Sequence, residues 1–191
     1  MQLHLTGCII FVSMNQMFNN PFTRLADHAD IPAISKLLNS AYRGESSRQG
    51  WTTEADLIAG EQRADETMVK EVLDMPGSVI LVNQDDQKEI SGCVNLQQHE
   101  DRIYLGMFSV TPKLQGGGIG KILLQASEVY AKSLGCRSIY MSVISVRTEL
   151  INWYIRHGYV DTGERKPFTE DGKTGKHLRE LEFMILEKAL Y

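Results

Sequence analysis

The sequence predicts a mixed α/β fold in which helices flank a central sheet. Amphipathic helix patterns alternate along the chain with short runs of β-branched residues, and residues 78–96 have the pattern of a buried hairpin. Residues 104–124 have the pattern of a strand, a glycine-rich loop and a helix. At 191 residues the chain fits one domain that is large enough to bury a core.

The composition argues against several classes of function. Hydrophobic residues make up 42% of the chain and charged residues 23%, as is ordinary for a globular protein. A net charge of -4 and a pI near 5.7 argue against a general nucleic-acid binder, which would carry a basic face. The three cysteines form no Cys-x-x-Cys pair and the five histidines show no ligand spacing. We therefore expect reduced thiols, a cytoplasmic location and no metal site.

Residues 1–21 are interpreted as an N-terminal extension to a domain that spans residues 22–191. The apolar run Cys8–Val12 is too short to cross a bilayer, and no Lys or Arg precedes it as in a signal peptide. We expect no membrane association, and either an extra strand or an accessory tail at this end. Met14 and Met17 are alternative starts.

The first half of the domain is expected to contain two long helices and a hairpin. Asp30 ahead of Pro32 fits a helix start, because proline suits the first turn. Thr53, with Asp56 three residues later, predicts a short helix beginning within a polar connection. The expected elements are a strand at 22–25, helices at 27–42 and 64–75, and hairpin strands at 78–82 and 90–96.

After the glycine loop, helices and strands alternate again. The helix that follows the loop is expected to end at Gly135 and to bury an apolar face that includes Val129. Residues 166–176 have the composition of a loop. The expected elements are helices at 118–134 and 149–157, and strands at 137–144, 159–165 and 177–186.

The glycines within residues 116–120 make the loop a candidate anion site. A junction between a strand and a helix directs free backbone N–H groups, and the helix dipole of roughly +0.5 charge, at one point. Glycine removes the side chains that would keep a phosphate away. Two known phosphate motifs do not fit. Gln115 and Ile122 stand where a nucleoside-triphosphate P-loop needs Gly and Ser or Thr, and the Gly-x-Gly-x-x-Gly spacing is absent from the sequence here.

The remaining pattern, Gln115-x-x-Gly118-x-Gly120 after a strand that ends Val110-x-Pro112, resembles the GNAT superfamily of N-acetyltransferases. In that family the loop wraps the pyrophosphate of acetyl-coenzyme A. The resemblance extends from about Phe22 to the C-terminus and implies a GNAT-like, mostly antiparallel, twisted sheet of about seven strands flanked by helices. It implies that the cosubstrate acetyl-CoA contacts Phe108, Ser109, Val110, Gln115, Gly116, Gly117, Gly118, Ile119, Gly120 and Lys121.

The helix that ends at Gly158 resembles the second motif of this family. There, a tyrosine shortly before Gly and an aromatic residue places its phenol beside the sulfur of coenzyme A, and Tyr154 with Gly158–Tyr159 matches that spacing. Arg147 departs from the pattern, because many members have Asn seven residues before this Tyr. The resemblance implies that Tyr154 protonates the departing thiolate. With a thiol pKa near about 8.5 and a phenol pKa near about 10, that step is uphill by roughly 2 kcal/mol. The alternative role for Tyr154 is a core aromatic beside Trp153.

The implied reaction is direct attack of a neutral amine on a thioester in a ternary complex. The resemblance assigns the stabilisation of the negative oxygen to the backbone N–H of Phe108 or Val110. A cysteine nucleophile is disfavoured, because Cys93 and Cys136 have no recognisable paired histidine in the sequence. An amine with a pKa near about 10.4 also needs a base. Five candidates are not distinguished by the sequence: Glu45, Glu54, Glu149, His177 and Glu180.

The expected acceptor is a primary amine of a small molecule or peptide. Arg43, Arg48 and Arg147 are candidates for holding a carboxylate on the acceptor, and Trp51 for forming a wall of the site. The alternative is that their loop is a solvated connection. Two alternatives for the whole chain are a non-catalytic coenzyme A sensor and a transferase of longer acyl groups. A homodimer is a further option that the sequence leaves open.

Overall fold

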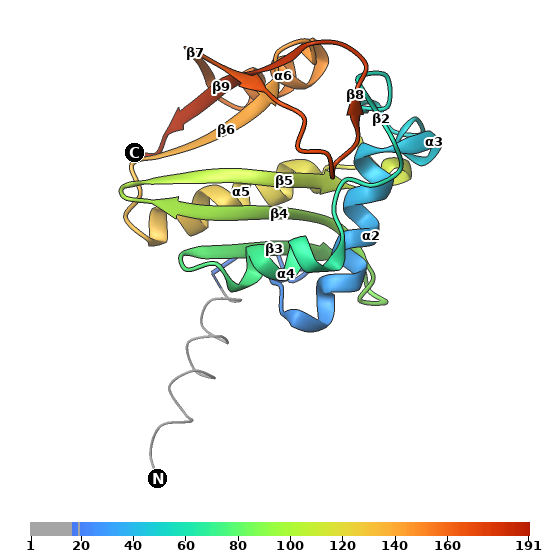
Figure 1. The fold of residues 1–191 in the computed structure, drawn as a ribbon. Coiled ribbons are helices and arrows are strands. Elements are labelled where there is room, and N and C mark those ends of the chain that lie inside the picture. Colours follow the sequence, from blue (N-terminus) through green and yellow to red (C-terminus); the bar gives the residue numbers. More distant parts are fainter. Residues whose placement is uncertain (1–16, 19) are drawn as a thin grey trace.

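The structure is a computed structural model that describes residues 17, 18 and 20–191 (Figure 1). Most of the expected N-terminal extension, residues 1–16 and 19, lies outside the described residues. Phe18 is described and is buried, with 5% of its surface exposed. It packs in the same cluster as Leu81 and Leu124, so the core of the domain includes a residue from the expected extension.

In the described residues, seven strands form one sheet in the order β1-β3-β4-β5-β6-β9-β7. The strands are β1 (Thr23–Leu25), β3 (Ser78–Gln84), β4 (Ile90–His99), β5 (Arg102–Val110), β6 (Ser138–Ile144), β7 (Val160–Phe168) and β9 (Leu181–Ala189). Neighbours are antiparallel except β5 and β6, which are parallel. The mixed, mostly antiparallel α/β sheet predicted from the sequence is therefore confirmed.

The parallel pair β5 and β6 is short. Residues 102–104 of β5 pair with residues 138–140 of β6, after which the two strands diverge (Figure 1). The side chains that face this divergence form the walls of the site described below.

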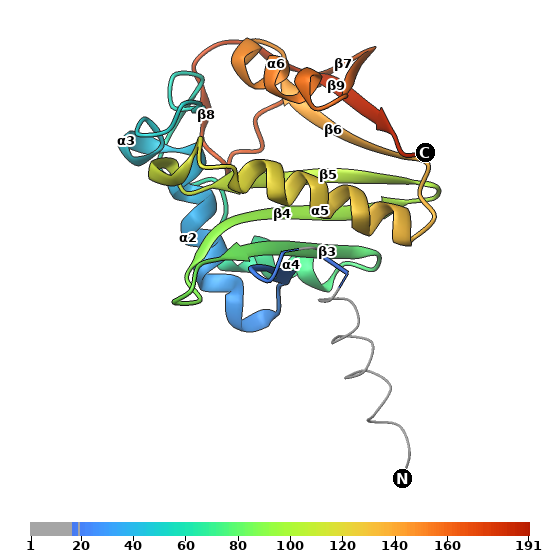
Figure 2. The ribbon, with the colours of Figure 1, turned by 180° about the vertical axis from the view of Figure 1, so that it is seen from behind.

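Helices cover both faces of the sheet. Helices α2 (Ile31–Tyr42) and α4 (Glu66–Asp74) lie on one face, and α5 (Ile119–Ser133) lies on the other (Figures 1 and 2). Helix α6 (Thr148–Arg156) lies next to β6 and β9 in both views. The short elements are η1 (His28–Asp30), α3 (Gly44–Ser47), η2 (Pro112–Leu114), and a separate pair formed by β2 (Ile58–Ala59) and β8 (Lys176–His177). Among the described residues, no helix has the length and apolar character needed to span a bilayer.

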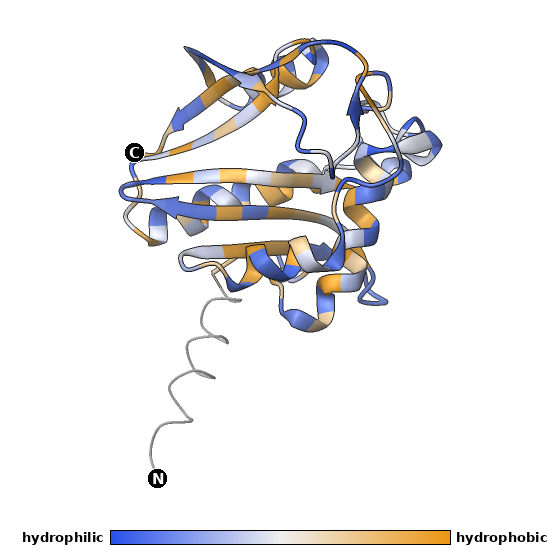
Figure 3. Cartoon of the chain, viewed as in Figure 1, coloured by the Kyte–Doolittle hydropathy of each residue, from blue (hydrophilic) through white to orange (hydrophobic). Residues whose placement is uncertain are grey.

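The central strands are buried on both faces because successive side chains point in opposite directions. In β3, Ile80 and Val82 pack against α2 and α4, whereas Leu81 packs in the cluster that includes α5. Hydrophobic residues accordingly gather in the central strands, and α2 and α4 carry both hydrophobic and hydrophilic residues (Figure 3). Full burial of one such aliphatic side chain stabilises the fold by roughly 1.5–3 kcal/mol.

The expected helix at residues 27–42 is divided into a 3-10 turn and α2. Asp27 caps the turn by accepting from the backbone N–H of Ala29, and the Asp30 carboxylate accepts from the N–H of Asp27. Asp30 also accepts two hydrogen bonds, of 2.7 and 2.8 Å, from the guanidinium of Arg24. The cap and β1 are thereby fixed to each other.

The prediction of a helix beginning at Thr53 is wrong. The helical turn in this connection is α3, which ends before Thr53, and the residues after Thr53 form turns. Asp56, the expected capping partner, accepts a hydrogen bond of 2.8 Å from Arg48 instead. Thr53 accepts from the N–H of Ala55 at 3.0 Å within this turn, so the ion pair replaces only the expected contribution of Asp56.

The other differences are in the extent of elements. Val129, expected on the buried face of α5, is 40% exposed, because the helix contacts the sheet along a narrower face than the apolar pattern indicated. Strand β7 continues to Phe168, three residues further than expected. His177 belongs to β8 and pairs with Ile58, so the closing strand β9 begins at Leu181 rather than at His177.

Candidate active site

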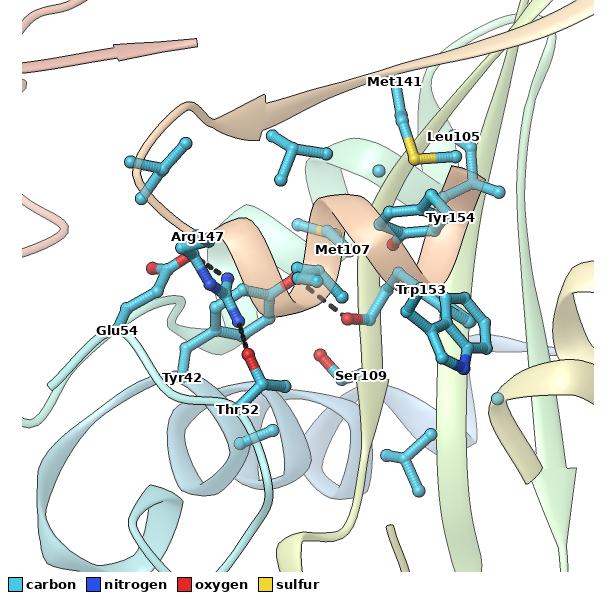
Figure 4. A pocket seen from close by; sticks show the side chains of 18 of the residues that line it. Tyr42, Thr52, Glu54, Leu105, Met107, Ser109, Met141, Arg147, Trp153 and Tyr154 are labelled. Carbon is cyan, nitrogen blue, oxygen red and sulfur yellow. Dashed lines mark hydrogen bonds and ion pairs between the residues drawn. The ribbon is translucent and has the colours of Figure 1, made fainter. Parts of the chain in front are cut away.

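A cavity of about 550 Å³ lies where β5 and β6 diverge (Figure 4). Its walls come from segments that are distant in the sequence. They include β5 (residues 104–110), β6 (141–144), the glycine loop and start of α5, the end of α2, the loop before β2, and α6. The cavity therefore joins the two motifs singled out in the sequence into one site.

A β-bulge shapes the wall formed by β5. Cys93 pairs with Ser109 and Asn95 pairs with Gly106, so two residues of β5 oppose one residue of β4. One of these two, Met107, has a φ of +49°, which is uncommon for a residue with a side chain. A bulge leaves its extra residue outside the regular ladder of hydrogen bonds. Phe108, whose N–H was assigned to the reaction, lies at this bulge.

Tyr42, the last residue of α2, supports the bulge from the opposite wall. Its hydroxyl donates a hydrogen bond of 3.0 Å to the carbonyl oxygen of Phe108. Burial, together with the charge of Glu54, raises the pKa of Tyr42 to about 12, so the phenol is protonated at neutral pH and can donate. Ser109 also lines the cavity, and its buried hydroxyl has no partner among the described residues (Figure 4).

The glycine loop presents an open surface to the cavity. Gly116 and Gly118 have φ values of +82° and +92°, a conformation that side chains rarely adopt. A Cβ added at either position would meet no atom within 4 Å among the described residues, so nothing there displaces an approaching group. Gly118 is the N-cap of the fifteen-residue α5, whose first N–H groups have no partner within the helix. These residues fit a diphosphate.

The remaining residues expected to contact the cosubstrate fall into two groups. Gly120, Lys121, Ser109 and Val110 line the cavity, whereas Gly117 and Ile119 lie outside its lining, with Ile119 packed against the core. The side chain of Gln115 lines the cavity but is engaged elsewhere. It accepts a hydrogen bond of 3.0 Å from the N–H of Trp51 and donates one of 3.2 Å to the carbonyl of Val110. Gln115 thereby connects the loop before β2 to the end of β5.

Tyr154 lines the cavity, with 3% of its surface exposed. Its ring lies 6.2 Å from Phe108, 5.1 Å from Trp153 and 5.7 Å from Tyr159, measured between centroids. None of the residues drawn in Figure 4 forms a hydrogen bond with its hydroxyl. Burial raises the pKa of Tyr154 far above its ordinary value, and the nearby Tyr42 adds to this effect. The phenol is therefore neutral and available as a proton donor.

A buried cluster of three charged residues, Arg43, Glu54 and Arg147, connects distant segments beside the cavity. The carboxylate of Glu54 accepts from Arg43 at 2.6 Å through one oxygen and from Arg147 at 2.9 Å through the other. Arg43 is 1% exposed and also donates to the carbonyl of Thr174 at 2.9 Å. It lies outside the cavity lining with its guanidinium engaged, so the expected role of Arg43 in holding a substrate carboxylate is not supported.

The other three residues proposed for the acceptor site differ in position. Arg48 is partly exposed and pairs with Glu45 and Asp56, away from the cavity lining. Trp51 lines the cavity and is 46% exposed, a position that suits a wall at the cavity entrance. Arg147 lines the cavity, is 7% exposed, and donates to Thr52 at 2.6 Å. Thr52 in turn donates to Glu149 at 2.9 Å.

Two structural observations concern other chemistry. In the part of the chain that the structure describes, no group of three or more His, Cys, Asp or Glu residues is arranged to hold a metal ion. Cys93 is buried beneath the bulge, and burial raises the pKa of its thiol to about 12. A buried thiol with such a pKa is a poor nucleophile.

Sequence reasoning missed Tyr42 and Arg63. Both line the cavity, and the guanidinium of Arg63 lies over the ring of Tyr42, 5.4 Å from its centroid. Tyr42 was recognised as a helix end, but 66 positions separate it from Phe108 and no spacing pairs the two. Glu54 was one of five unranked candidates for the base, and its position between two arginines depends on contacts that the sequence does not display.

Comparison with known proteins agrees with this geometry. The family model described as the acetyltransferase (GNAT) family matches residues 32–159, which is more than half of the chain. The chain therefore belongs to the GNAT acetyltransferase family. Comparison with curated proteins gives no match.

Solved structures share the fold at low sequence identity. A protein proposed to be a phosphinothricin N-acetyltransferase has 18% identity and a TM-score of 0.67 over 88% of this chain and 98% of its own. The ribosomal-protein-S18-alanine N-acetyltransferase from Escherichia coli has 14% identity and a TM-score of 0.64 over 88% and 92%. A proposed acetyltransferase from Salmonella typhimurium, solved with its cofactor acetyl-CoA, has 20% identity and a TM-score of 0.63 over 88% and 93%.

Proposed function

We propose that this acetyltransferase transfers an acetyl group from acetyl-CoA to a primary amine of a small molecule or peptide, by direct attack in a ternary complex. One observation carries the proposal: a single cavity joins an open glycine loop to a bulged strand and to the phenol of Tyr154. Acetyl-CoA supplies an activated acyl group as a thioester. Direct transfer is favoured over a cysteine intermediate because Cys93 is buried and its pKa is raised to about 12.

The cosubstrate is proposed to lie between the loop and β5. The main chain at Gly116 and Gly118 would hold its diphosphate, since both positions are open and line the cavity. Lys121, in the first turn of α5, adds a positive charge beside them. The bulge at Met107–Phe108 then faces the reactive end.

The N–H of Phe108 is proposed to stabilise the negative charge that develops on the acyl oxygen. The bulge includes Phe108, and a backbone donor outside the strand ladder is free to point at a ligand. The hydrogen bond from Tyr42 to the Phe108 carbonyl orients this peptide segment before a substrate binds. Such preorganised donors contribute because they need no reorientation during the reaction.

Tyr154 is proposed to give its proton to the departing thiolate. Its raised pKa makes it a weaker acid in absolute terms, but the same burial disfavours a thiolate beside it. The two effects oppose each other, so proton transfer within the buried pair remains accessible. We assign no base: each oxygen of Glu54 accepts a hydrogen bond from an arginine, so this carboxylate is already engaged in two ion pairs.

A thiol-release assay over amino acids, peptides, polyamines and aminoglycosides tests the proposal, with acetyl-CoA and longer acyl-CoA donors in parallel. We expect release with acetyl-CoA that depends on the amine and falls in Tyr154→Phe. Binding of coenzyme A without release for any amine would support a sensor instead. Faster thiol release from longer acyl-CoA donors would identify one of them, rather than acetyl-CoA, as the acyl donor and would leave the rest of the proposal unchanged.

A further inference from the structure

The charged side chains that line the cavity are mostly cationic. Among the described residues these are one carboxylate, Glu54, and four lysine or arginine side chains: Arg63, Lys121, Arg147 and Arg156. Lys121 belongs to the glycine loop end, where a diphosphate is proposed to bind. Arg63 and Arg147 lie instead on the side of Tyr42, and the charges of both lower the pKa of that phenol. The part of the cavity beside Tyr42, where we place the amine substrate, therefore has its own positive charge.

The single acid does not neutralise this charge. Glu54 is shared between Arg43 and Arg147, so the buried cluster of these three residues carries one net positive charge. A carboxylate oxygen of Glu149 forms a long ion pair of 3.9 Å with Nε of Arg147, but the Glu149 side chain is 43% exposed and lies outside the cavity lining. A buried charge without a full partner is unfavourable, and an anionic ligand would remove that penalty.

Arg147 also has an unused donor. Its terminal nitrogens donate to Glu54 and Thr52, whereas its buried Nε has no hydrogen-bond partner among the described residues. The side chain is 9% exposed and lines the cavity (Figure 4). Most buried hydrogen-bond donors in folded proteins are satisfied, so an unsatisfied donor in a cavity wall indicates that a ligand supplies its hydrogen-bond acceptor.

The guanidinium of Arg63 is available to bind the same anionic ligand. Within the part of the chain that the structure describes, the interaction of its guanidinium is with the ring of Tyr42, 5.4 Å away, and it forms no ion pair. Because the hydroxyl of Tyr42 donates a hydrogen bond to the carbonyl of Phe108, an anion held beside Tyr42 lies next to the bulge, where we place the amine substrate. Guanidinium groups bind carboxylates with two parallel hydrogen bonds, which fixes orientation as well as position.

We propose that the acceptor is an amine that carries a carboxylate, and that Arg63 and Arg147 bind this carboxylate while the amine faces Phe108 and Tyr154. The inference rests on the proposed function and narrows its substrate class to amino acids and related small acids. It disfavours polyamines, since added positive charge would be repelled by the same arginines.

The test measures binding rather than transfer. The two tryptophans of the chain, Trp51 and Trp153, both line the cavity, so their fluorescence reports occupancy. Protein saturated with coenzyme A is titrated with N-acetylated amino acids and, separately, with the matching N-acetylated amino-acid amides, which lack the negative charge. We expect the best acids to bind at least about tenfold more tightly than their amides, as for loss of a hydrogen bond to a charged group.

Variants locate the effect. Arg63→Gln, at a half-buried position outside the buried cluster, should remove most of the preference for acids and leave amide binding unchanged. Arg147→Lys keeps a positive charge beside Glu54, lacks the Nε donor, and should also reduce the preference. Arg48→Gln is the matched control, since Arg48 lies outside the cavity lining, and should keep the preference intact.

Equal affinity for every acid and its amide, including failure of both to bind, would overturn the inference. So would tighter binding of spermidine than of the acids. A preference for acids without any thiol release would contradict the proposed function and leave the carboxylate site standing, so the two failures are distinguishable.

Discussion

The hydroxyl of Tyr42 donates a hydrogen bond of 3.0 Å to the carbonyl oxygen of Phe108, which joins the end of α2 to the bulge in β5. The bond spans 66 positions in the sequence and closes one wall of the cavity. It holds the peptide segment that is proposed to stabilise the acyl oxygen. The hydrogen bond should therefore matter for both stability and rate.

Tyr42→Phe should lower the free energy of unfolding by about 0.5–1.5 kcal/mol, the usual net worth of one hydrogen bond. It should also lower kcat, because the Phe108 segment loses its orientation, while the affinity for coenzyme A stays unchanged. Urea unfolding and steady-state kinetics measure the two effects. Tyr140→Phe is the control, since it removes a bond of 3.0 Å to His99 outside the cavity lining. An unchanged kcat in Tyr42→Phe would show that the bulge does not depend on this bond.

Tyr154→Phe should lower kcat by about 10²–10⁴-fold, the usual contribution of a positioned acid, without changing stability. Stability should persist because none of the residues drawn in Figure 4 forms a hydrogen bond with the hydroxyl. Tyr159→Phe is a matched control: its hydroxyl is buried and lacks a partner within the described part, but Tyr159 does not line the cavity. Equal kcat values in the two variants would remove the role of Tyr154 as acid.

Gly118→Ala should weaken binding of coenzyme A and destabilise the fold by about 1–2 kcal/mol, the strain of a left-handed residue with a side chain. Gly135→Ala introduces similar strain, at a φ of +73° with no atom within 4 Å among the described residues, at the far end of α5. Calorimetric titration should show the affinity loss for Gly118→Ala alone. The same loss in both variants would mean that strain, rather than the loop surface, controls binding.

Stability should fall at alkaline pH. Burial raises the pKa of the Cys93 thiol from 9.0 to about 12, and that of Tyr42 from 10.0 to about 12. The folded state therefore holds these protons more tightly than the unfolded state, and this contribution is complete below pH 9.0. It is lost as pH rises toward about 12.

Chemical denaturation at a series of pH values measures this loss. Cys93→Ala should reduce the slope of stability against pH above the ordinary thiol pKa, since one of the groups that must ionise is gone. A stability that rises across this range, or a wild-type slope that is kept in the variant, would contradict the burial of this thiol. Thiol reagents should likewise modify Cys93 only under conditions that unfold the protein.

Local patterns predicted most of the fold. Periodicity located α2, α5 and the β3–β4 hairpin, because a buried face imposes regular spacing on neighbouring residues. The missed features depend on contacts between distant residues. The expected contribution of Asp56 to a cap at Thr53 is replaced by an ion pair between Asp56 and Arg48, which periodicity does not reveal.

The site was predictable where it depends on short motifs. The glycine loop and Tyr154 were located from spacing, and both line one cavity. The roles of the arginines were not predictable, because Arg43 and Arg147 share Glu54 from positions 11 and 93 residues away. Three-dimensional packing alone places Arg43 outside the cavity lining and Arg147 within it, with an Nε that has no hydrogen-bond partner among the described residues.

The proposal that the main chain after β5 binds the diphosphate of acetyl-CoA is tested most directly by calorimetric titration with coenzyme A and with pantetheine, which lacks the diphosphate and the nucleotide. We expect coenzyme A to bind far more tightly than pantetheine, and Gly118→Ala to weaken coenzyme A binding without affecting pantetheine. Equal affinities for the two ligands, or no binding of coenzyme A, would contradict the account.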